Sequence, residues 1–249
     1  MSTTTPDTAP LTVVLVHGAF TDASSWNGVI ERLQAAGVQV TAAPNPLRGL
    51  LADSAYVKSF LEQIPGPVLA VGHSYTGAVI SNAATDANNV VGLVFVAAFA
   101  TDEGETVGQV AGTSKDAILS PALVTLHYPV GNGAQTAVEL VVDPAKFRDV
   151  VAADLPAEQT AVMAATQRPI AELAFSQPCG PPAWKSRPVW AVVAIGDKAA
   201  GADVTRSQAE RAGAKITEVE GSHVIMISQP QAVTDVIVTA ARAVADSRR

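Results

Sequence analysis

Apolar residues gather in short, uninterrupted runs along this chain. The runs lie at residues 12–16, 38–42, 67–71, 90–98 and 189–195. They lack the alternation of apolar and polar residues that marks a strand with one solvated face, so they predict strands buried on both faces. A weaker strand candidate spans residues 215–220.

Between these runs, apolar residues recur at the period of a helix. The clearest helical faces are formed by Trp26, Val29, Ile30 and Leu33, by Val57, Phe60, Leu61 and Ile64, and by Val233, Val236, Ile237, Ala240, Ala241 and Val244. Strands that alternate with helices predict an α/β fold, in which helices cover both faces of a mainly parallel sheet.

One region departs from this rhythm. Residues 101–187 contain helical patches and turns rich in Gly and Pro, but no confident buried strand. This stretch is too long for a plain crossover between two core strands. We therefore predict a core domain made of residues 11–100 and 188–249, a mostly helical cap at residues 101–187, and a flexible tail at residues 1–10.

Composition narrows the class of protein. The chain has 249 residues, 48% of them apolar, which is enough for a substantial core. Its 23 acidic and 16 basic residues argue against a nucleic-acid or anionic membrane surface, and Cys179, the single cysteine, excludes an internal disulfide. The first residues lack the basic start and apolar segment of a secretory signal, so we expect a cytoplasmic protein. Its expected partners are a small-molecule substrate and a second copy of the chain in a homodimer.

The sequence "VGHSYTGAVI" carries the first sign of chemistry. Ser74 stands where an apolar strand stops, between Gly72 and Gly77. A serine on a tight strand-to-helix turn presents its hydroxyl at the carboxyl end of the sheet, beside free backbone N–H groups. The same pattern also suits a serine that only caps the N-terminus of a helix. Ser74 is therefore a candidate nucleophile that needs a base and an acid.

Four histidines are available as the base. His17 ends the first strand, His73 precedes Ser74, and His127 lies in the cap. His223 follows the last strand candidate, in a loop at the carboxyl edge of the sheet. That position suits a base that reaches Ser74 from above, so we favour His223 over the view that it is a solvated surface residue.

For the acid we favour Asp197. It directly follows the strand at residues 189–195, which brings it to the same edge as Ser74. Asp102 and Glu103 are rivals, and Asp203 is better suited to capping a helix that starts at Val204. The chain order Ser74, Asp197, His223 is the order of the α/β-hydrolase triad.

These motifs together resemble the α/β-hydrolase family over nearly the whole chain beyond the tail. "VLVHGAFTDASSW" is similar to its His-Gly loop, "VGHSYTGAVI" to its nucleophile elbow, "IGDKAAG" to its acid loop and "EGSHVIMISQP" to its histidine loop. Small bacterial esterase-like members, and the branch of plant methylesterases and hydroxynitrile lyases, look most similar. The resemblance implies an oxyanion hole formed by the backbone N–H groups of Ala19 and Tyr75, with Phe20 lining the pocket behind.

Two departures from the family bear on function. Thr76 occupies the position of a glycine in the elbow, and we interpret it as a variant elbow, although a strained turn that misaligns Ser74 is the alternative. Cyanohydrin cleavage in the lyase branch relies on a threonine and a lysine where this chain has Gly18 and Val224. The residues thus favour hydrolysis over lysis.

The predicted reaction is serine hydrolysis of a small or medium carboxylic ester, lactone or thioester. No metal or organic cofactor is expected, since the chain has no H-E-x-x-H, C-x-x-C or nucleotide-binding glycine loop. Because the imidazole must be neutral to act as a base, activity should fall as the pH drops through about 6 to 7.

Cap residues should select the substrate. His127 and Tyr128 are candidates, as are Leu126, Phe147, Met163 and Phe175, although most of these could simply pack the cap. Alternatives to an esterase on the same scaffold are a carbon–carbon hydrolase, a cofactor-free perhydrolase and a ligand receptor with slow turnover.

Overall fold

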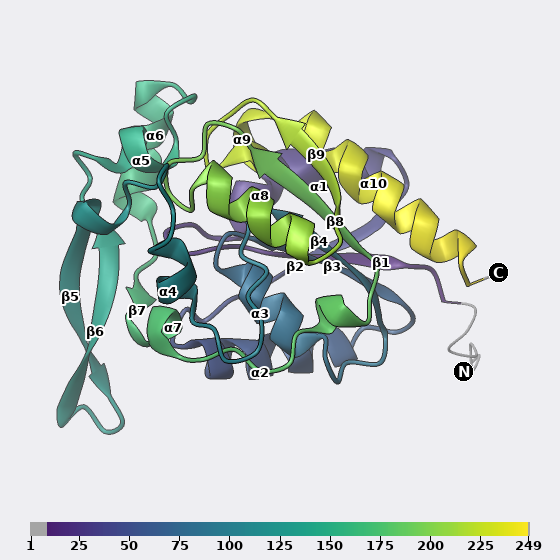
Figure 1. Ribbon diagram of the computed structural model, residues 1–249, viewed down its shortest axis with the longest axis horizontal. Coiled ribbons are helices and arrows are strands. Elements are labelled where there is room, and N and C mark those ends of the chain that lie inside the picture. The colour runs from purple at the N-terminus through teal and green to yellow at the C-terminus, as the bar shows by residue number, and fades with distance from the viewer. Residues whose placement is uncertain (1–8, 249) are drawn as a thin grey trace.

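A computed structural model describes residues 9–248, and most of the tail predicted at residues 1–10 lies outside that range. Over the described residues, six parallel strands form the central sheet in the order β2-β1-β3-β4-β8-β9 (Figure 1). They are β1 (Thr12–Val16), β2 (Gln39–Ala43), β3 (Val68–His73), β4 (Val90–Val96), β8 (Val189–Ala194) and β9 (Lys215–Val219). The chain leaves β1 toward one edge and returns to its other side at β3, so the strand order reverses between β1 and β3. Ligands bind at such switch points in open α/β sheets.

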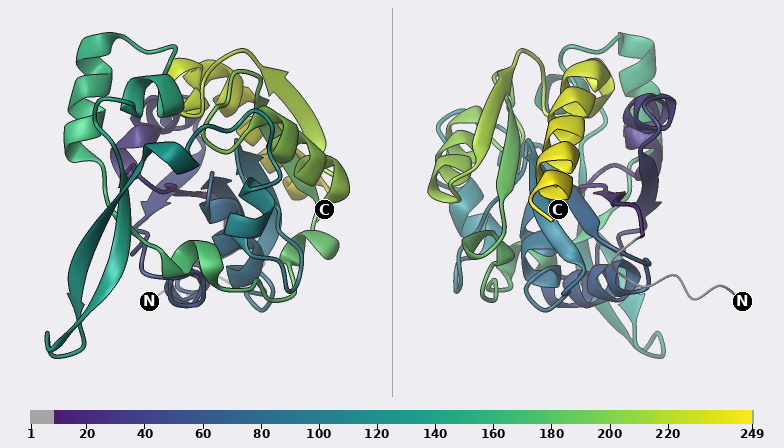
Figure 2. Two further views of the ribbon diagram at one scale, coloured as in Figure 1. Left: turned by 60° about the vertical axis from the view of Figure 1, so that its left-hand side comes forward. Right: turned by 90° about the vertical axis from the view of Figure 1, so that its right-hand side faces the viewer.

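Helices cover both faces of the sheet (Figures 1 and 2). On one face α1 (Asn27–Ala35), which follows the short helix η2 (Ala23–Trp26), packs against the long C-terminal helix α10 (Pro230–Asp246). On the other face lie α2 (Leu50–Glu62), α3 (Thr76–Ala83) and α8 (Ala202–Arg211). Within residues 9–248 no helix is both long and apolar enough to cross a membrane.

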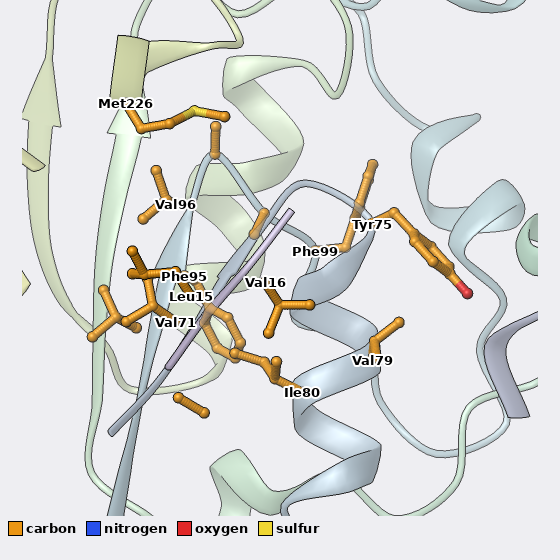
Figure 3. Packing of buried hydrophobic residues seen from close by; sticks show 14 of the residues in the cluster. Leu15, Val16, Val71, Tyr75, Val79, Ile80, Phe95, Val96, Phe99 and Met226 are labelled. Atoms are coloured by element: carbon orange, nitrogen blue, oxygen red, sulfur yellow. The ribbon is translucent and has the colours of Figure 1, made fainter. Parts of the chain in front are cut away.

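The core lies between the central strands and these helices. Every residue of β1, β3 and β8 is buried, whereas β2 and β9 at the sheet edges are partly exposed. Figure 3 shows Leu15, Val71 and Phe95 from neighbouring strands packed beside Ile80 of α3. The apolar runs at residues 67–71 and 189–195 thus correspond to strands covered on both faces.

The insertion at residues 101–187 differs from the mostly helical cap that the sequence predicts. It contains the helices α4 (Val107–Ala111), α5 (Phe147–Val151), α6 (Ala157–Thr166) and α7 (Leu173–Ser176), with the 3-10 turns η3 (Ser120–Ala122) and η4 (Ala183–Lys185). It also contains a long antiparallel hairpin of β5 (Leu123–Val130) and β6 (Gln135–Val142), joined by β7 (Ile170–Ala171), and this hairpin projects from the molecule (Figures 1 and 2).

The hairpin was missed for a physical reason. Most of β5 is exposed, so its sequence "LVTLHYPV" is neither fully apolar nor a strict alternation of apolar and polar residues. The stretch from Pro156 to Phe175 forms two short helices rather than one, because Pro169 lies between α6 and α7.

Candidate active site

Ser74 lies in a strained turn between β3 and α3. Its backbone φ is 58°, in the left-handed region that non-glycine residues rarely adopt. The backbone of α3 then runs so close to neighbouring segments that a Cβ atom on Gly77 would lie 2.3 Å from the carbonyl oxygen of Phe99. The alternative role of Ser74 as a helix cap is not seen, because Tyr75 occupies the N-cap position of α3.

The Thr76 side chain bonds the serine turn to two strands. Its buried hydroxyl donates to the carbonyl oxygens of Val16 at 2.9 Å and of His73 at 2.8 Å. These bonds join the ends of β1 and β3 at the switch point. The side chain that threonine has and the family's glycine lacks therefore hydrogen-bonds the two strand ends.

His223 lies between Ser74 and Asp197. Its Nε2 atom is 2.9 Å from the Ser74 hydroxyl oxygen, and its Nδ1 atom is 2.8 Å from an Asp197 carboxylate oxygen. Because an ionised carboxylate can only accept a hydrogen bond, the proton of the neutral His223 ring lies on Nδ1 and is donated to Asp197. Nε2 is thereby left free to accept the hydroxyl proton of Ser74. The three side chains are almost wholly buried, with exposed fractions of 7% for Ser74, 5% for His223 and 1% for Asp197.

Asp197 is held by the loop that follows β8. Its second carboxylate oxygen accepts the backbone N–H groups of Ala199 at 2.8 Å and Ala200 at 3.0 Å. The carboxylate therefore has fixed partners on both oxygens and presents one of them to the imidazole.

The rival acids lie elsewhere. Asp102 pairs with Lys185, and Glu103 is exposed. Asp203 lies inside the first turn of α8, whose N-cap is Gly201, and its carboxylate accepts the Ser114 hydroxyl at 2.6 Å and the Lys115 N–H at 2.8 Å. The expectation that Asp203 caps a helix starting at Val204 is thus wrong, because α8 begins two residues earlier and the side chain bonds to the insertion.

Two residues hold the histidine loop in ways that the sequence analysis missed. His73 is fully buried, and its Nε2–H donates to the carbonyl oxygen of His223 at 3.0 Å. Burial holds the pKa of His73 well below its usual value, and the neighbouring His223 lowers it further. Asp154, from the insertion, accepts the backbone N–H of Ser222 at 2.9 Å.

The predicted oxyanion donors are free to bind a ligand. Among the described residues, neither the backbone N–H of Ala19 nor that of Tyr75 has a hydrogen-bond acceptor. Ala19 belongs to the loop after β1, and a Cβ atom on the neighbouring Gly18 would lie 2.9 Å from the Cβ atom of Ser74. The His-Gly loop and the serine turn therefore pack directly against each other.

His17 is a third buried imidazole at this edge. Its Nδ1–H donates to the Gly18 carbonyl oxygen at 3.0 Å, so its Nε2 is an acceptor for the N–H of Asn45 and for Arg168 of the insertion, both at 3.3 Å. Burial lowers the pKa of His17, which is consistent with this neutral acceptor role. Arg168 thus connects the insertion to the loop that carries Ala19.

Comparison with known proteins identifies the family. A model of the alpha/beta hydrolase family matches residues 13–236. The chain belongs to this family. No curated protein sequence matches it.

Solved structures agree with the alpha/beta hydrolase assignment. Polyneuridine aldehyde esterase superposes with a TM-score of 0.77 at 20% identity, covering 94% of this chain and 100% of that one. Tomato methylketone synthase I gives 0.77 at 21% identity, covering 94% and 99%. A pyrethroid hydrolase from Sphingobium faniae JZ-2 gives 0.75 at 20% identity, covering 96% and 100%. At this identity the likeness establishes the fold, and the fold predicted from the sequence is confirmed.

A cavity of about 490 Å³ lies between the His-Gly loop and α6, and Ser74, Asp197 and His223 are not among the residues that line it. Phe20 and Thr21 of the His-Gly loop line one side, and Gln159, Met163 and Gln167, in or just after α6, line the other. The cavity therefore lies where the insertion meets the loop that carries Ala19. Phe20 and Met163, two of the residues expected to contact a substrate, line this cavity, and their role in substrate binding stays a prediction.

The other predicted pocket residues lie apart from this cavity. His127 and Tyr128 are on the projecting hairpin, where His127 is exposed. The Tyr128 ring stacks on Arg48, with 4.3 Å between the ring centroid and the guanidinium carbon. Arg48 also pairs with Glu139 of β6 at 2.6 Å, which ties the hairpin to the core domain. Phe147 is buried, Leu126 is exposed, and Phe175 packs against Tyr75. Over residues 9–248 no three His, Cys, Asp or Glu side chains are grouped to hold a metal ion.

Proposed function

We propose that this protein is a serine hydrolase that cleaves small or medium carboxylic esters, including lactones or thioesters. The observation that carries the proposal is the position of His223, with Nε2 at 2.9 Å from Ser74 Oγ and Nδ1 at 2.8 Å from Asp197. A base within hydrogen-bond reach of a hydroxyl, itself oriented by a carboxylate, is the arrangement that activates a serine nucleophile.

The reaction follows from these contacts. His223 takes the proton of Ser74 as the hydroxyl oxygen attacks the ester carbonyl carbon. The N–H groups of Ala19 and Tyr75 bind the negative oxygen of the tetrahedral intermediate, which collapses to an acyl-enzyme as His223 protonates the leaving alcohol. Water activated by His223 then releases the acid and restores the serine.

Three further features support ester hydrolysis. Polyneuridine aldehyde esterase and the pyrethroid hydrolase, both similar in fold, are named for hydrolytic activity. The cavity of about 490 Å³ is lined by Phe20, the residue after the proposed oxyanion donor Ala19, and has the volume of a small-molecule pocket. Gly18 packs so tightly that a Cβ atom would lie 2.8 Å from His73 Nδ1, so the threonine of the lyase branch would not fit this arrangement.

The direct test uses a fluorophosphonate probe followed by peptide mapping. We expect one covalent adduct on Ser74, which is lost in Ser74→Ala and strongly reduced in His223→Ala. A panel of p-nitrophenyl esters of increasing acyl length, with lactones and a peracid-formation assay, then separates esterase from perhydrolase chemistry. An unlabelled Ser74 in the folded protein would refute the proposal.

A further inference from the structure

Tyr75, the residue after the proposed nucleophile, has a side chain that the reaction does not use. It is wholly buried, and in Figure 3 its hydroxyl lies at the end of a side chain that points away from the strands. The hydroxyl donates to a carboxylate oxygen of Asp53 at 2.8 Å. The Tyr75 ring also packs against Phe175 of α7, with 6.1 Å between the ring centroids.

Asp53 is a buried acid that forms no ion pair within residues 9–248, although the charge of Arg48 lowers its pKa. It lies in the first turn of α2 with no exposed surface, and its other carboxylate oxygen accepts the backbone N–H of Arg48 at 3.0 Å. Burial raises the pKa of Asp53, while its hydrogen bonds to Arg48 and Tyr75 act in the opposite direction. Burial and the Asp53 charge raise the pKa of Tyr75 well above its usual value, so the phenol keeps its proton and acts as the donor.

A phenylalanine at position 75 would fill the same space without this polar pair. Burying a carboxylate is costly, and packing alone does not require one. What the pair adds is a fixed anchor at the far end of the Tyr75 side chain. The backbone N–H at the near end has no acceptor within the described chain and follows directly on the strained turn of Ser74.

We propose that the Tyr75–Asp53 hydrogen bond is a positioning device for the oxyanion hole. By anchoring the ring to α2, it limits rotation of the Ser74–Tyr75 peptide and keeps its N–H directed at the place where negative charge develops. Asp53 is then a positioning residue that acts through Tyr75. This inference rests on the proposed ester hydrolysis, and it adds a requirement that the Ser74, His223 and Asp197 contacts do not contain.

The test compares Tyr75→Phe, Asp53→Asn and the double variant with the wild-type chain. Tyr56→Phe is the matched control, because it makes the same chemical change at an exposed tyrosine of α2, the helix that carries Asp53. The measurements are kcat and KM for p-nitrophenyl butyrate, the rate of fluorophosphonate labelling of Ser74, and thermal unfolding.

Loss of a whole oxyanion donor lowers kcat by about 100- to 1000-fold, so a misdirected donor should lower it by roughly 10-fold or more. We expect that loss in Tyr75→Phe, with little change in KM and a parallel loss in labelling rate. The double variant should lose no more than Tyr75→Phe alone, because the two residues act as one unit. Tyr56→Phe should match the wild type.

The double variant also separates positioning from stability. It buries no charge, and the Asn side-chain oxygen can still accept the Arg48 N–H, so it should fold even if Tyr75→Phe alone does not. A folded double variant with wild-type kcat and labelling rate would overturn this inference and leave the proposed function intact. Failure of the wild-type chain to label at Ser74 would overturn both.

Discussion

Replacing Thr76 with the glycine of the family pattern should lower the stability of the folded protein. In Thr76→Gly the carbonyl oxygens of Val16 and His73 both lose the hydroxyl that joins the ends of β1 and β3. One net hydrogen bond contributes about 1 kcal/mol. The buried methyl group contributes about as much again, and glycine costs a further 0.5–1 kcal/mol, roughly, in a helix. We therefore expect the free energy of unfolding to fall by about 3 kcal/mol.

Two companion variants divide this loss. Thr76→Ser keeps the hydroxyl and removes only the methyl group, so it should cost about 1 kcal/mol. Thr76→Val keeps the shape and removes the hydroxyl from a buried position, which should cost about 1–3 kcal/mol. Urea unfolding followed by tryptophan fluorescence measures all three, provided that the dependence of unfolding free energy on urea stays constant.

The result that refutes this reasoning is specific. If Thr76→Gly is as stable as the wild type or more stable, the two hydrogen bonds contribute nothing and Thr76 is only a tolerated deviation. If Thr76→Ser costs as much as Thr76→Gly, the methyl group rather than the hydroxyl matters at this position.

Four further outcomes are expected. Ser74→Gly should be more stable than Ser74→Ala by about 1 kcal/mol, because only glycine adopts a φ of 58° without strain, and equal urea midpoints would contradict this. Gly77→Ala should lower the free energy of unfolding by about 3 kcal/mol through its clash with the Phe99 carbonyl, whereas Gly180→Ala, where a Cβ atom meets only Asn82 at 3.4 Å, should cost far less. Asp197→Asn should reduce kcat for an ester by roughly 1000-fold or more, while Asp102→Asn leaves it unchanged, and a comparable loss in Asp102→Asn would reopen the choice of acid. Finally, burial lowers the folded-state pKa of His73 and His17, so the unfolded chain binds their protons first as the pH drops. The free energy of unfolding should therefore fall below about pH 6.5, by up to about 1.4 kcal/mol per pH unit for each group, and the raised pKa of Asp53 acts in the opposite direction. His73→Asn should make the free energy of unfolding depend less steeply on pH, whereas the exposed control His127→Asn should not.

The central sheet could be predicted because its strands are covered on both faces. Runs such as residues 12–16 and 189–195 are almost wholly apolar, and each matches a strand to within a residue or two. The hairpin could not be predicted in the same way, because exposed strands tolerate mixed residues. His127 and Tyr128, which were chosen as cap residues near a substrate, lie on this hairpin.

Some side chains at the site can be predicted from the sequence and others cannot. Ser74, Asp197 and His223 stand at strand ends, where the chain order alone places them on one edge of the sheet. The groups that hold them do not follow from local sequence. Asp154 and Arg168 come from the insertion, and nothing in their neighbourhood signals that one contacts the histidine loop and the other His17. Such contacts depend on how two distant segments pack.

The bonds between the insertion and the core domain include those of Asp154 to Ser222, of Arg168 to His17, and of Glu139 to Arg48. Two of these partners adjoin residues that the proposed reaction needs, His223 and the loop of Ala19. An exchange of insertions between relatives, whether by recombination or by protein engineering, would consequently alter the alignment of the reacting groups along with the shape of the pocket. Variation in substrate preference should therefore accumulate along α6, which lines the cavity, while the residues that touch the core domain change only together with their partners.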